Sequence, residues 1–214
     1  MTINKDLRAR FVEARDQGSR PTCLAFAMSD AHSAERPPHR SLSVDFVYYH
    51  ALRRMPLNHG DNGVGVKQVT DALRIDGQPV ETDWPYSHTL PVDLSTWKPP
   101  GKLAVMHATA TSNQLSVDWL CARLDQDQPC VIVFLPSERF YYADAAGQLP
   151  SHSPDPDLPA SHAVIAVGYG VTSTRRHVLI RNSWGTSWGQ YGHAWLAEDY
   201  LKPRLLSVIS LQAN

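Results

Sequence analysis

Residues 129–135 read Pro-Cys-Val-Ile-Val-Phe-Leu, a run of β-branched and aromatic side chains that predicts a buried β-strand. Later in the chain, further strands are predicted at 163–169, 177–181 and 191–197. Earlier in the chain the apolar residues recur at helical spacing, and helices are predicted at 22–32, 44–54, 66–75 and 115–124. Helices followed by strands are typical of an α+β fold with two lobes.

The ends of the predicted helices are marked by residues that begin or stop a helix. Side-chain oxygens that can accept a hydrogen bond from a first-turn N–H group stand at three helix starts, Thr22, Ser43 and Ser116. Pro37-Pro38 ends the first helix, and Gly77 follows the third. The two linker candidates are 79–101 and 136–160. The other irregular stretches are an extended entry segment at 1–22 and loops at 58–65 and 150–159.

Composition and charge exclude several classes of function. The chain of 214 residues carries 20 Lys+Arg against 21 Asp+Glu, so it lacks the basic excess that attracts nucleic acid or an anionic membrane. Its most apolar runs, 130–135 and 163–167, fall far short of the roughly 20 residues that a bilayer requires. No apolar segment of the kind found in a secretory signal follows Met1, and we therefore expect a cytoplasmic protein.

The cysteines and histidines do not form a metal or disulfide pattern. Three cysteines cannot all pair, so no disulfide scaffold is expected. Cys121 stands in an apolar helix and Cys130 in an apolar strand, and both are predicted to be buried and unreactive. No His/Cys pair has zinc-type spacing with a second pair nearby, so neither a metal nor a cofactor is predicted. The histidines other than His162 are interpreted as surface or structural residues.

A candidate nucleophile stands at the start of the first predicted helix, where residues 17–23 read Gln-Gly-Ser-Arg-Pro-Thr-Cys. The positive end of the helix dipole favours the thiolate of Cys23 over the thiol, and the thiolate is the form that attacks carbon. The side chain of Gln17 can donate an N–H to a developing oxyanion, next to the backbone N–H of Cys23. Taken alone, the motif also fits a small buried cysteine in a helix.

Two segments of the second half carry a candidate base and its partner. His162 enters the apolar strand Ser-His-Ala-Val-Ile-Ala-Val-Gly-Tyr-Gly at 161–170, and Asn182 opens the turn Asn-Ser-Trp-Gly-Thr-Ser-Trp-Gly at 182–189. An asparagine at a strand end can accept the imidazole N–H and hold the ring toward a thiolate. Trp184 can cover that hydrogen bond. Taken alone, His162 also fits a solvent-facing strand residue, and the turn fits a packing element.

Together, the three segments resemble the papain-like cysteine peptidases, the papain and cathepsin group. The shared features are the Gln17…Cys23 spacing, Cys-Leu-Ala-Phe at 23–26, the His-Ala-Val strand ending in Val-Gly-Tyr-Gly, and the Asn-Ser-Trp-Gly-Thr-x-Trp-Gly turn. His162 lies within the family's spacing of about 130–150 residues after the cysteine, and Asn182 lies slightly beyond it. The resemblance covers about residues 6–200.

The fold that this resemblance implies is a single papain-like catalytic domain of the α+β class with two lobes. A helical lobe would contain about residues 1–110 plus the C-terminal tail. An antiparallel, β-barrel-like lobe would contain about residues 111–205. The active site would lie in the cleft between the lobes.

The family's catalytic roles carry over to matching positions. Cys23 resembles the nucleophile, and His162 resembles the general base that later protonates the leaving amine. Asn182 resembles the residue that orients the imidazole, and Gln17 the oxyanion-hole donor. Trp184 resembles the shield over the His–Asn hydrogen bond.

The family's substrate contacts fall on Gly63, Val64, Gly65, Ala160, Ser161, Trp184 and Trp188. In the family a Gly-rich loop pairs with an extended substrate backbone. Its second glycine falls on Val64 in one register and on Gly65 in another. Trp188 resembles a wall of the cleft on the primed side. Ala160 and Ala163 flank His162, and their small size favours an apolar residue at the second position before the cut.

Several positions depart from the family pattern. Leu24 follows the nucleophile where the family usually has an aromatic residue. Arg20 replaces a cysteine that is normally disulfide-bonded, which agrees with a reducing compartment. Ser161 replaces an acidic residue or asparagine, and we expect an altered pH profile. Without a preceding pro-segment the chain resembles the compact prokaryotic-type branch, and we expect a protein inhibitor or regulator to restrain it.

The activity that the resemblance implies is a cysteine endopeptidase that works through a covalent acyl-enzyme. The same triad also fits an amidase, deamidase, isopeptidase or acyltransferase. A peptidase module delivered to another cell as an effector or toxin, and a non-catalytic peptide-binding module, remain alternatives. The expected partners are a peptide or protein substrate and the regulator, with no nucleic acid and no membrane.

Overall fold

The computed structural model describes residues 1–56, 61–150 and 155–214. Of the predicted loops at 58–65 and 150–159, residues 58–60 and 151–154 lie outside the described residues. The same holds for His59 and His152, which the sequence analysis interpreted as surface or structural residues.

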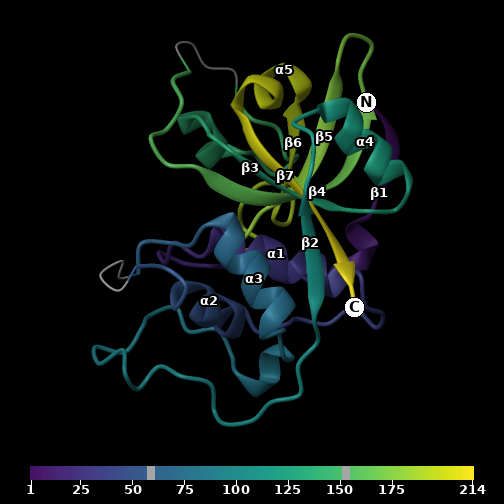
Figure 1. The fold of residues 1–214 in the computed structure, drawn as a ribbon. Helices are drawn as coiled ribbons and strands as arrows, with labels where there is room; N and C mark the ends of the chain where they lie inside the picture. The colour runs from purple at the N-terminus through teal and green to yellow at the C-terminus, as the bar shows by residue number, and fades with distance from the viewer. Residues whose placement is uncertain (57–60, 151–154) are drawn as a thin grey trace. The chain divides into compact units, whose positions relative to one another are not determined.

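The described chain forms two compact units (Figure 1). The strand unit contains residues 1–16 and 111–210, and the helix unit contains residues 17–110 and 211–214. Residues 1–16 were predicted to belong to the helical lobe. The structure groups them with the strands, because the strand at the N-terminus pairs with the strand that begins at His162. Within the described residues, neither unit has a helix long and apolar enough to cross a membrane.

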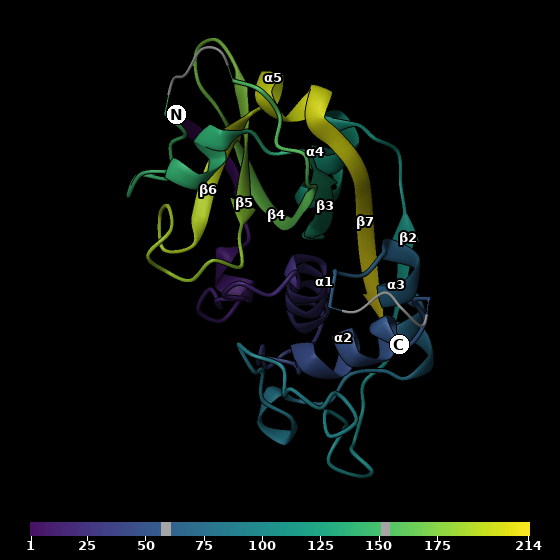
Figure 2. The ribbon, with the colours of Figure 1, turned by 90° about the vertical axis from the view of Figure 1, so that its left-hand side faces the viewer.

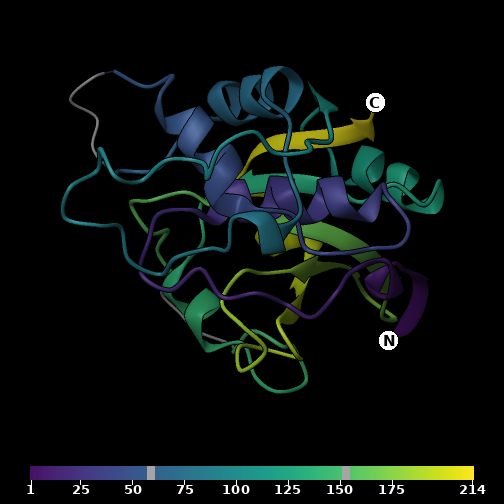
Figure 3. The ribbon, with the colours of Figure 1, turned by 90° about the horizontal axis from the view of Figure 1, so that it is seen from below.

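Three α-helices form the body of the helix unit as described: α1 (Cys23–Ala34), α2 (Val44–Leu52) and α3 (Val66–Ile75). They pack against one another, as the view from below shows (Figure 3). All three were predicted from the sequence, and α3 has the predicted bounds. Ser43 caps α2 as predicted, because its side chain accepts a hydrogen bond from the Phe46 N–H. Thr22 occupies the N-cap position of α1, but its side chain makes no capping hydrogen bond.

The remaining helical segments are short except for α4 (Val117–Asp125), which was predicted and which Ser116 caps through the Trp119 N–H. The short segments are η1 (Arg8–Arg10), η2 (Glu81–Asp83), η3 (Glu138–Tyr142), α5 (Glu198–Leu201) and η4 (Lys202–Arg204). Within the predicted irregular stretch 79–101, the structure contains only η2 and an isolated bridge between Val80 and Leu42.

The strands form a sheet with the order β2-β7-β3-β4-β5-β6, and β1 pairs with β4. Their bounds are β1 (Thr2–Asp6), β2 (Ala108–Ser112), β3 (Cys130–Phe134), β4 (His162–Val171), β5 (Arg176–Arg181), β6 (His193–Ala197) and β7 (Leu205–Ala213). The strands from β3 to β6 lie side by side and are antiparallel (Figure 2). These four strands were predicted, whereas β1, β2 and β7 were not. The chain passes from one unit to the other within β2 and β7.

Two glycines in β4 allow β1 to approach closely. A Cβ atom at Gly168 would lie 2.4 Å from the Lys5 carbonyl oxygen, and one at Gly170 would lie 2.7 Å from the Thr2 carbonyl oxygen. Any larger residue would therefore push β1 away from β4. This contact gives the Val-Gly-Tyr-Gly pattern at the end of β4 a physical reason.

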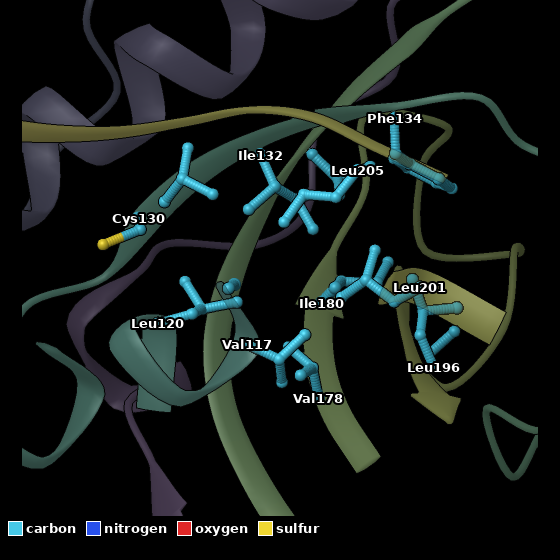
Figure 4. Close-up of a cluster of buried hydrophobic side chains, with 14 of the residues drawn as sticks. Val117, Leu120, Cys130, Ile132, Phe134, Val178, Ile180, Leu196, Leu201 and Leu205 are labelled. Atoms are coloured by element: carbon cyan, nitrogen blue, oxygen red, sulfur yellow. The ribbon is translucent and has the colours of Figure 1, made fainter. Parts of the chain in front are cut away.

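The core of the strand unit lies between the sheet and the helices α4 and α5 (Figure 4). Its fully buried side chains include Leu120, Ile132, Phe134, Val178, Ile180, Leu196 and Leu201. Cys121 and Cys130 also belong to this core, so their predicted burial is confirmed. Burial raises the pKa of the Cys121 thiol to about 11, which keeps it in the unreactive form.

Candidate active site

The strand unit brings His162 and Asn182 together at one end of its sheet. His162 is the first residue of β4, and Asn182 follows the last residue of β5. Because these strands are antiparallel, with Ile165 opposite Arg181, the start of one lies beside the end of the other. The His162 Nε2 atom lies 2.7 Å from Asn182 Oδ1, and both side chains are buried.

A backbone group fixes the direction of this hydrogen bond. The Ser183 N–H donates to Asn182 Oδ1 over 2.8 Å, so the atom that faces His162 is an acceptor. The His162 Nε2 atom therefore carries a proton and donates it. Nδ1 is then the ring nitrogen left for proton transfer. Asn182 is itself anchored, because its own N–H donates to the Gly192 carbonyl oxygen over 2.9 Å.

Aromatic rings cover the His162–Asn182 pair. The centroid of the Trp184 ring lies 4.8 Å from that of His162, and the centroid of Phe140 lies 5.7 Å from it. Tyr141 stacks on Trp184, with 5.2 Å between centroids and 5° between ring planes. A hydrogen bond under such a cover is stronger than one in water. The Trp184 ring thus lies against the His162 ring, and its role as a shield stays a prediction.

The sequence analysis missed Phe140 and Tyr141. Both residues lie in the stretch 136–160, which was predicted to be a linker candidate. The run Phe-Tyr-Tyr at 140–142 was the available signal, since three consecutive aromatic side chains need a surface to pack against.

Trp188 is buried, whereas Ala160 and Ser161, which precede β4, are exposed. Trp188 is 7% exposed, and its Nε1–H donates to the Phe140 carbonyl oxygen over 3.2 Å. Its ring packs against Trp184, with 5.6 Å between centroids, and so supports the covering ring from behind. Ala160 and Ser161 are exposed directly before His162. The substrate contacts expected of these residues stay predictions.

The helix unit holds Cys23 and Gln17. Cys23 is half-buried at the first position of α1, and the residues after it up to Ala34 are all buried. The sulfur therefore stands at the positive end of a helix of 12 residues. Gln17 is buried, and its Nε2 donates to the Arg20 carbonyl oxygen over 2.8 Å. The turn between the two predicted residues thus orients the Gln17 amide.

The loop with the predicted backbone contacts lies against the same turn. Gly63 has a positive φ of 85°, and a Cβ atom there would lie 3.4 Å from the Pro21 carbonyl oxygen. Gly65 is the N-cap residue of α3, and Val64 is half-buried between the two glycines. Gly63 therefore has a backbone conformation that favours glycine, whereas Gly65 does not.

The predicted catalytic residues divide between the two units. The strand unit joins His162, Asn182 and Trp184, and the helix unit joins Gln17 and Cys23 through one turn. The pairing of Cys23 with His162 stays a prediction. Within the described residues, no three His, Cys, Asp or Glu side chains form a group that could hold a metal ion.

Comparison with known proteins gives a consistent result. The family model for "Papain family cysteine protease" matches residues 4–204. Cysteine proteinase 1 of Entamoeba histolytica is 26% identical over 191 residues, covering 87% of this chain and 60% of that protein. Cathepsin K of Gallus gallus is 24% identical over 188 residues, covering 86% of this chain and 55% of that protein. The chain thus spans somewhat more than half the length of these relatives.

Solved structures share the fold. Xylellain, a cysteine protease from Xylella fastidiosa, has a TM-score of 0.77 at 24% identity, over 95% of this chain and 83% of that one. The cysteine protease CMS1MS2 of Carica candamarcensis, solved in complex with E-64, has a TM-score of 0.72 at 21% identity, over 98% and 97% of the two chains. The α+β fold predicted from the sequence is therefore confirmed as papain-like.

Proposed function

Because the chain belongs to the papain family of cysteine proteases, we propose that it is a cysteine endopeptidase that cleaves peptide bonds through a covalent acyl-enzyme. The hydrogen bond between His162 Nε2 and Asn182 Oδ1 is the observation that carries the proposal. It orients the ring and leaves Nδ1 for proton transfer, as a general base in a triad requires.

The first half of the proposed reaction acylates the enzyme. The Cys23 sulfur, as thiolate, attacks the carbonyl carbon of the scissile peptide, and the carbonyl electron pair moves to oxygen. When this pair returns, the C–N bond breaks. The His162 Nδ1 atom gives its proton to the leaving amine, so that a thioester and a neutral amine result.

The second half restores the enzyme. A water molecule attacks the thioester carbon, and its proton passes to Nδ1 of His162. The C–S bond breaks as the tetrahedral intermediate collapses, which releases a carboxylic acid and the Cys23 thiolate. The oxygen of the water ends in the acid product.

We assign the stabilisation of the oxyanion to the Gln17 amide and the backbone N–H of Cys23. The hydrogen bond from Gln17 Nε2 to the Arg20 carbonyl oxygen supports this role, because it fixes the amide before substrate binds. Each such donor supplies on the order of 2.7–4 kcal/mol of transition-state stabilisation.

The aromatic cover has a role in the same proposal. Trp184 and Phe140 keep water from the His162–Asn182 hydrogen bond, and Tyr141, a residue that is 52% exposed, extends this surface toward the solvent. The proposed substrate is an extended peptide whose backbone pairs with residues 63–65.

Covalent labelling tests the nucleophile. An epoxysuccinyl inhibitor of the E-64 type is the suitable probe, since the related CMS1MS2 protease was solved in complex with E-64. We expect wild type and Cys121→Ala to gain the mass of one inhibitor, and Cys23→Ala to gain none. A wild-type protein without label, or a label retained in Cys23→Ala, would contradict the proposal.

The pH dependence of alkylation tests the pairing of Cys23 with His162. If an imidazolium stabilises the thiolate, iodoacetamide should modify Cys23 rapidly well below pH 8.5, the approximate pKa of an ordinary cysteine. His162→Ala should abolish this low-pH reactivity. A rate that follows the titration of an ordinary thiol in wild type would mean that the pair does not form.

A further inference from the structure

A buried cation lies three residues before Cys23 and takes no part in the mechanism above. The Arg20 side chain is only 4% exposed. Its Nη1 atom donates to Asp45 Oδ1 over 2.7 Å and to the Ser87 carbonyl oxygen over 2.6 Å. Its Nε atom lies 3.6 Å from Asp61 Oδ2. A guanidinium removed from water requires such partners, because its desolvation is otherwise strongly unfavourable.

Aromatic rings complete the surroundings of this guanidinium. Its central carbon lies between 5.0 and 5.4 Å from the ring centroids of Tyr48, Tyr86 and Trp97. Cation–π attraction of this kind is strongest where water is absent. The Arg20 Nη2 atom has no hydrogen-bond partner within the described part of the chain, and the ring faces stand in place of further acceptors.

The ion pair between Arg20 and Asp61 joins the cluster to the loop at 61–65, which contains the proposed substrate contacts. Asp61 precedes Gly63 by two residues, and it accepts a hydrogen bond from the Tyr48 hydroxyl over 2.5 Å besides its ion pair with Arg20. Gly63 itself lies close to the Pro21 carbonyl oxygen. The loop and the turn before the nucleophile are thus in contact, and the ion pair joins them beside that contact.

The backbone of Arg20 holds the other side of the turn. Its carbonyl oxygen accepts hydrogen bonds from Gln17 Nε2 and from the Thr22 N–H, both over 2.8 Å. The Tyr86 hydroxyl donates to the Gln17 carbonyl oxygen over 2.8 Å and lies 2.9 Å from Thr22 Oγ1. Cys23 follows directly. Arg20 therefore connects Gln17, which is the proposed oxyanion donor, with the start of α1 and with the Gly63 loop.

We propose that Arg20 is a positioning residue of the active site: through Asp61, its buried guanidinium holds the Gly63 loop in a fixed place against the turn that carries Cys23. A peptide that binds the loop must present its carbonyl carbon to the sulfur within a few tenths of an ångström. Loss of the ion pair between Arg20 and Asp61 loosens the loop and weakens peptide binding. A small alkylating reagent does not use the loop, so its reaction with Cys23 stays unchanged. The kinetic part of this inference rests on the proposed function.

The test variant is Asp61→Asn, which keeps an acceptor for Tyr48 and removes one of the two carboxylate charges that face Arg20, while the Asp45 ion pair remains. The matched control is Asp71→Asn, which removes a carboxylate from an exposed ion pair with Lys67 on α3. Hydrogen exchange of peptides covering 20–24 and 61–65 should be faster in Asp61→Asn and unchanged in the control. The kcat/KM for a peptide should fall about ten- to a hundredfold, mainly through KM, and the iodoacetamide rate at Cys23 should stay within twofold.

Two results would overturn the proposal. One is unchanged exchange at 61–65 in Asp61→Asn, whether or not the protein cleaves peptides. The other is faster exchange without a change in KM, which would make the cluster merely structural. If wild type neither cleaves peptides nor labels at Cys23, the proposed function fails, while exchange still decides whether Arg20 holds the loop. If Asp61→Asn does not fold, Arg20→Lys, which keeps the charge but loses the planar fork, is measured in the same way.

Discussion

Lowering the pH from 7 to 5 should destabilise the helix unit through one buried histidine in the same helix as Cys23. His32 is fully buried in α1, and Arg36 Nε–H donates to its Nε2 atom over 3.1 Å. A guanidinium only donates, so Nε2 is an acceptor. The proton of the neutral ring is then on Nδ1, which lies 3.1 Å from Gln78 Oε1. A second proton would have to enter on Nε2, directly against the Arg36 charge.

The magnitude follows from the pKa of His32. Burial lowers this pKa from 6.5 to about 4, and the Arg36 charge adds to the effect while the Gln78 hydrogen bond opposes it. Because the folded pKa is the lower one, the unfolded chain binds the proton more readily. The contribution to stability is therefore complete above pH 6.5 and is lost as the pH falls toward 4. The gap corresponds to about 3 kcal/mol in all, of which about 2 kcal/mol is lost between pH 7 and pH 5.

Urea unfolding of wild type and His32→Gln between pH 8 and pH 5 measures this loss. Glutamine offers a donor and an acceptor to Gln78 and Arg36 but does not titrate. The difference between the two proteins at pH 8 gives the cost of the substitution itself. Between pH 7 and pH 5 the free energy of unfolding should fall by about 2 kcal/mol more in wild type than in the variant. A variant that loses as much as wild type would refute the reasoning.

Three further predictions concern the strand unit. Asn182→Ala should lower kcat roughly 10- to 100-fold with little change in KM, because His162 loses a hydrogen bond of about 1.5–3 kcal/mol; an unchanged kcat for a peptide substrate would contradict the assigned role. Gly192→Ala should lower the free energy of unfolding by about 2–4 kcal/mol, since φ is +82° and the new Cβ would lie 2.3 Å from that of Ala14; urea midpoints measure this. Cys121, whose pKa burial raises to about 11, should react with iodoacetamide only after unfolding, and mass mapping of the native protein would detect an exception.

Elements with a strong local signal could be predicted from the sequence. The bounds of α3 follow from its apolar face and from Gly77 after it, and β3 follows from its β-branched run. β1 was missed because its sequence Thr-Ile-Asn-Lys-Asp has no apolar pattern, and its place depends on Gly168 and Gly170 far along the chain. A strand held mainly by backbone hydrogen bonds and close approach leaves no trace in side-chain periodicity.

In the candidate site, too, local motifs could be predicted from the sequence and long-range contacts could not. The residues with proposed chemical roles stand in short motifs, so their types and spacing indicated them. The partners of Arg20 could not be predicted, because Asp45 and Asp61 belong to α2 and to a loop that only the fold brings to one guanidinium. From the sequence alone, Arg20 is notable only because it replaces a cysteine of the family pattern. Long-range ion pairs have no sequence pattern, and their geometry becomes visible only in the structure.

The two units that carry the proposed site each contain a buried neutral histidine, and this predicts that acid acts on both. In the strand unit, backbone groups fix Asn182: its N–H donates to the Gly192 carbonyl oxygen, and its Oδ1 accepts from the Ser183 N–H. Gly192 precedes His193, and burial lowers the pKa of His193 to about 4. In the helix unit, burial lowers the pKa of His32 in α1 to about 4 as well. A fall in pH converts either ring into an unfavourable buried cation, so hydrogen exchange should become faster between pH 7 and pH 5 both in α1 and in β6, which begins at His193. Faster exchange of α1 together with unchanged exchange of β6 would contradict this expectation.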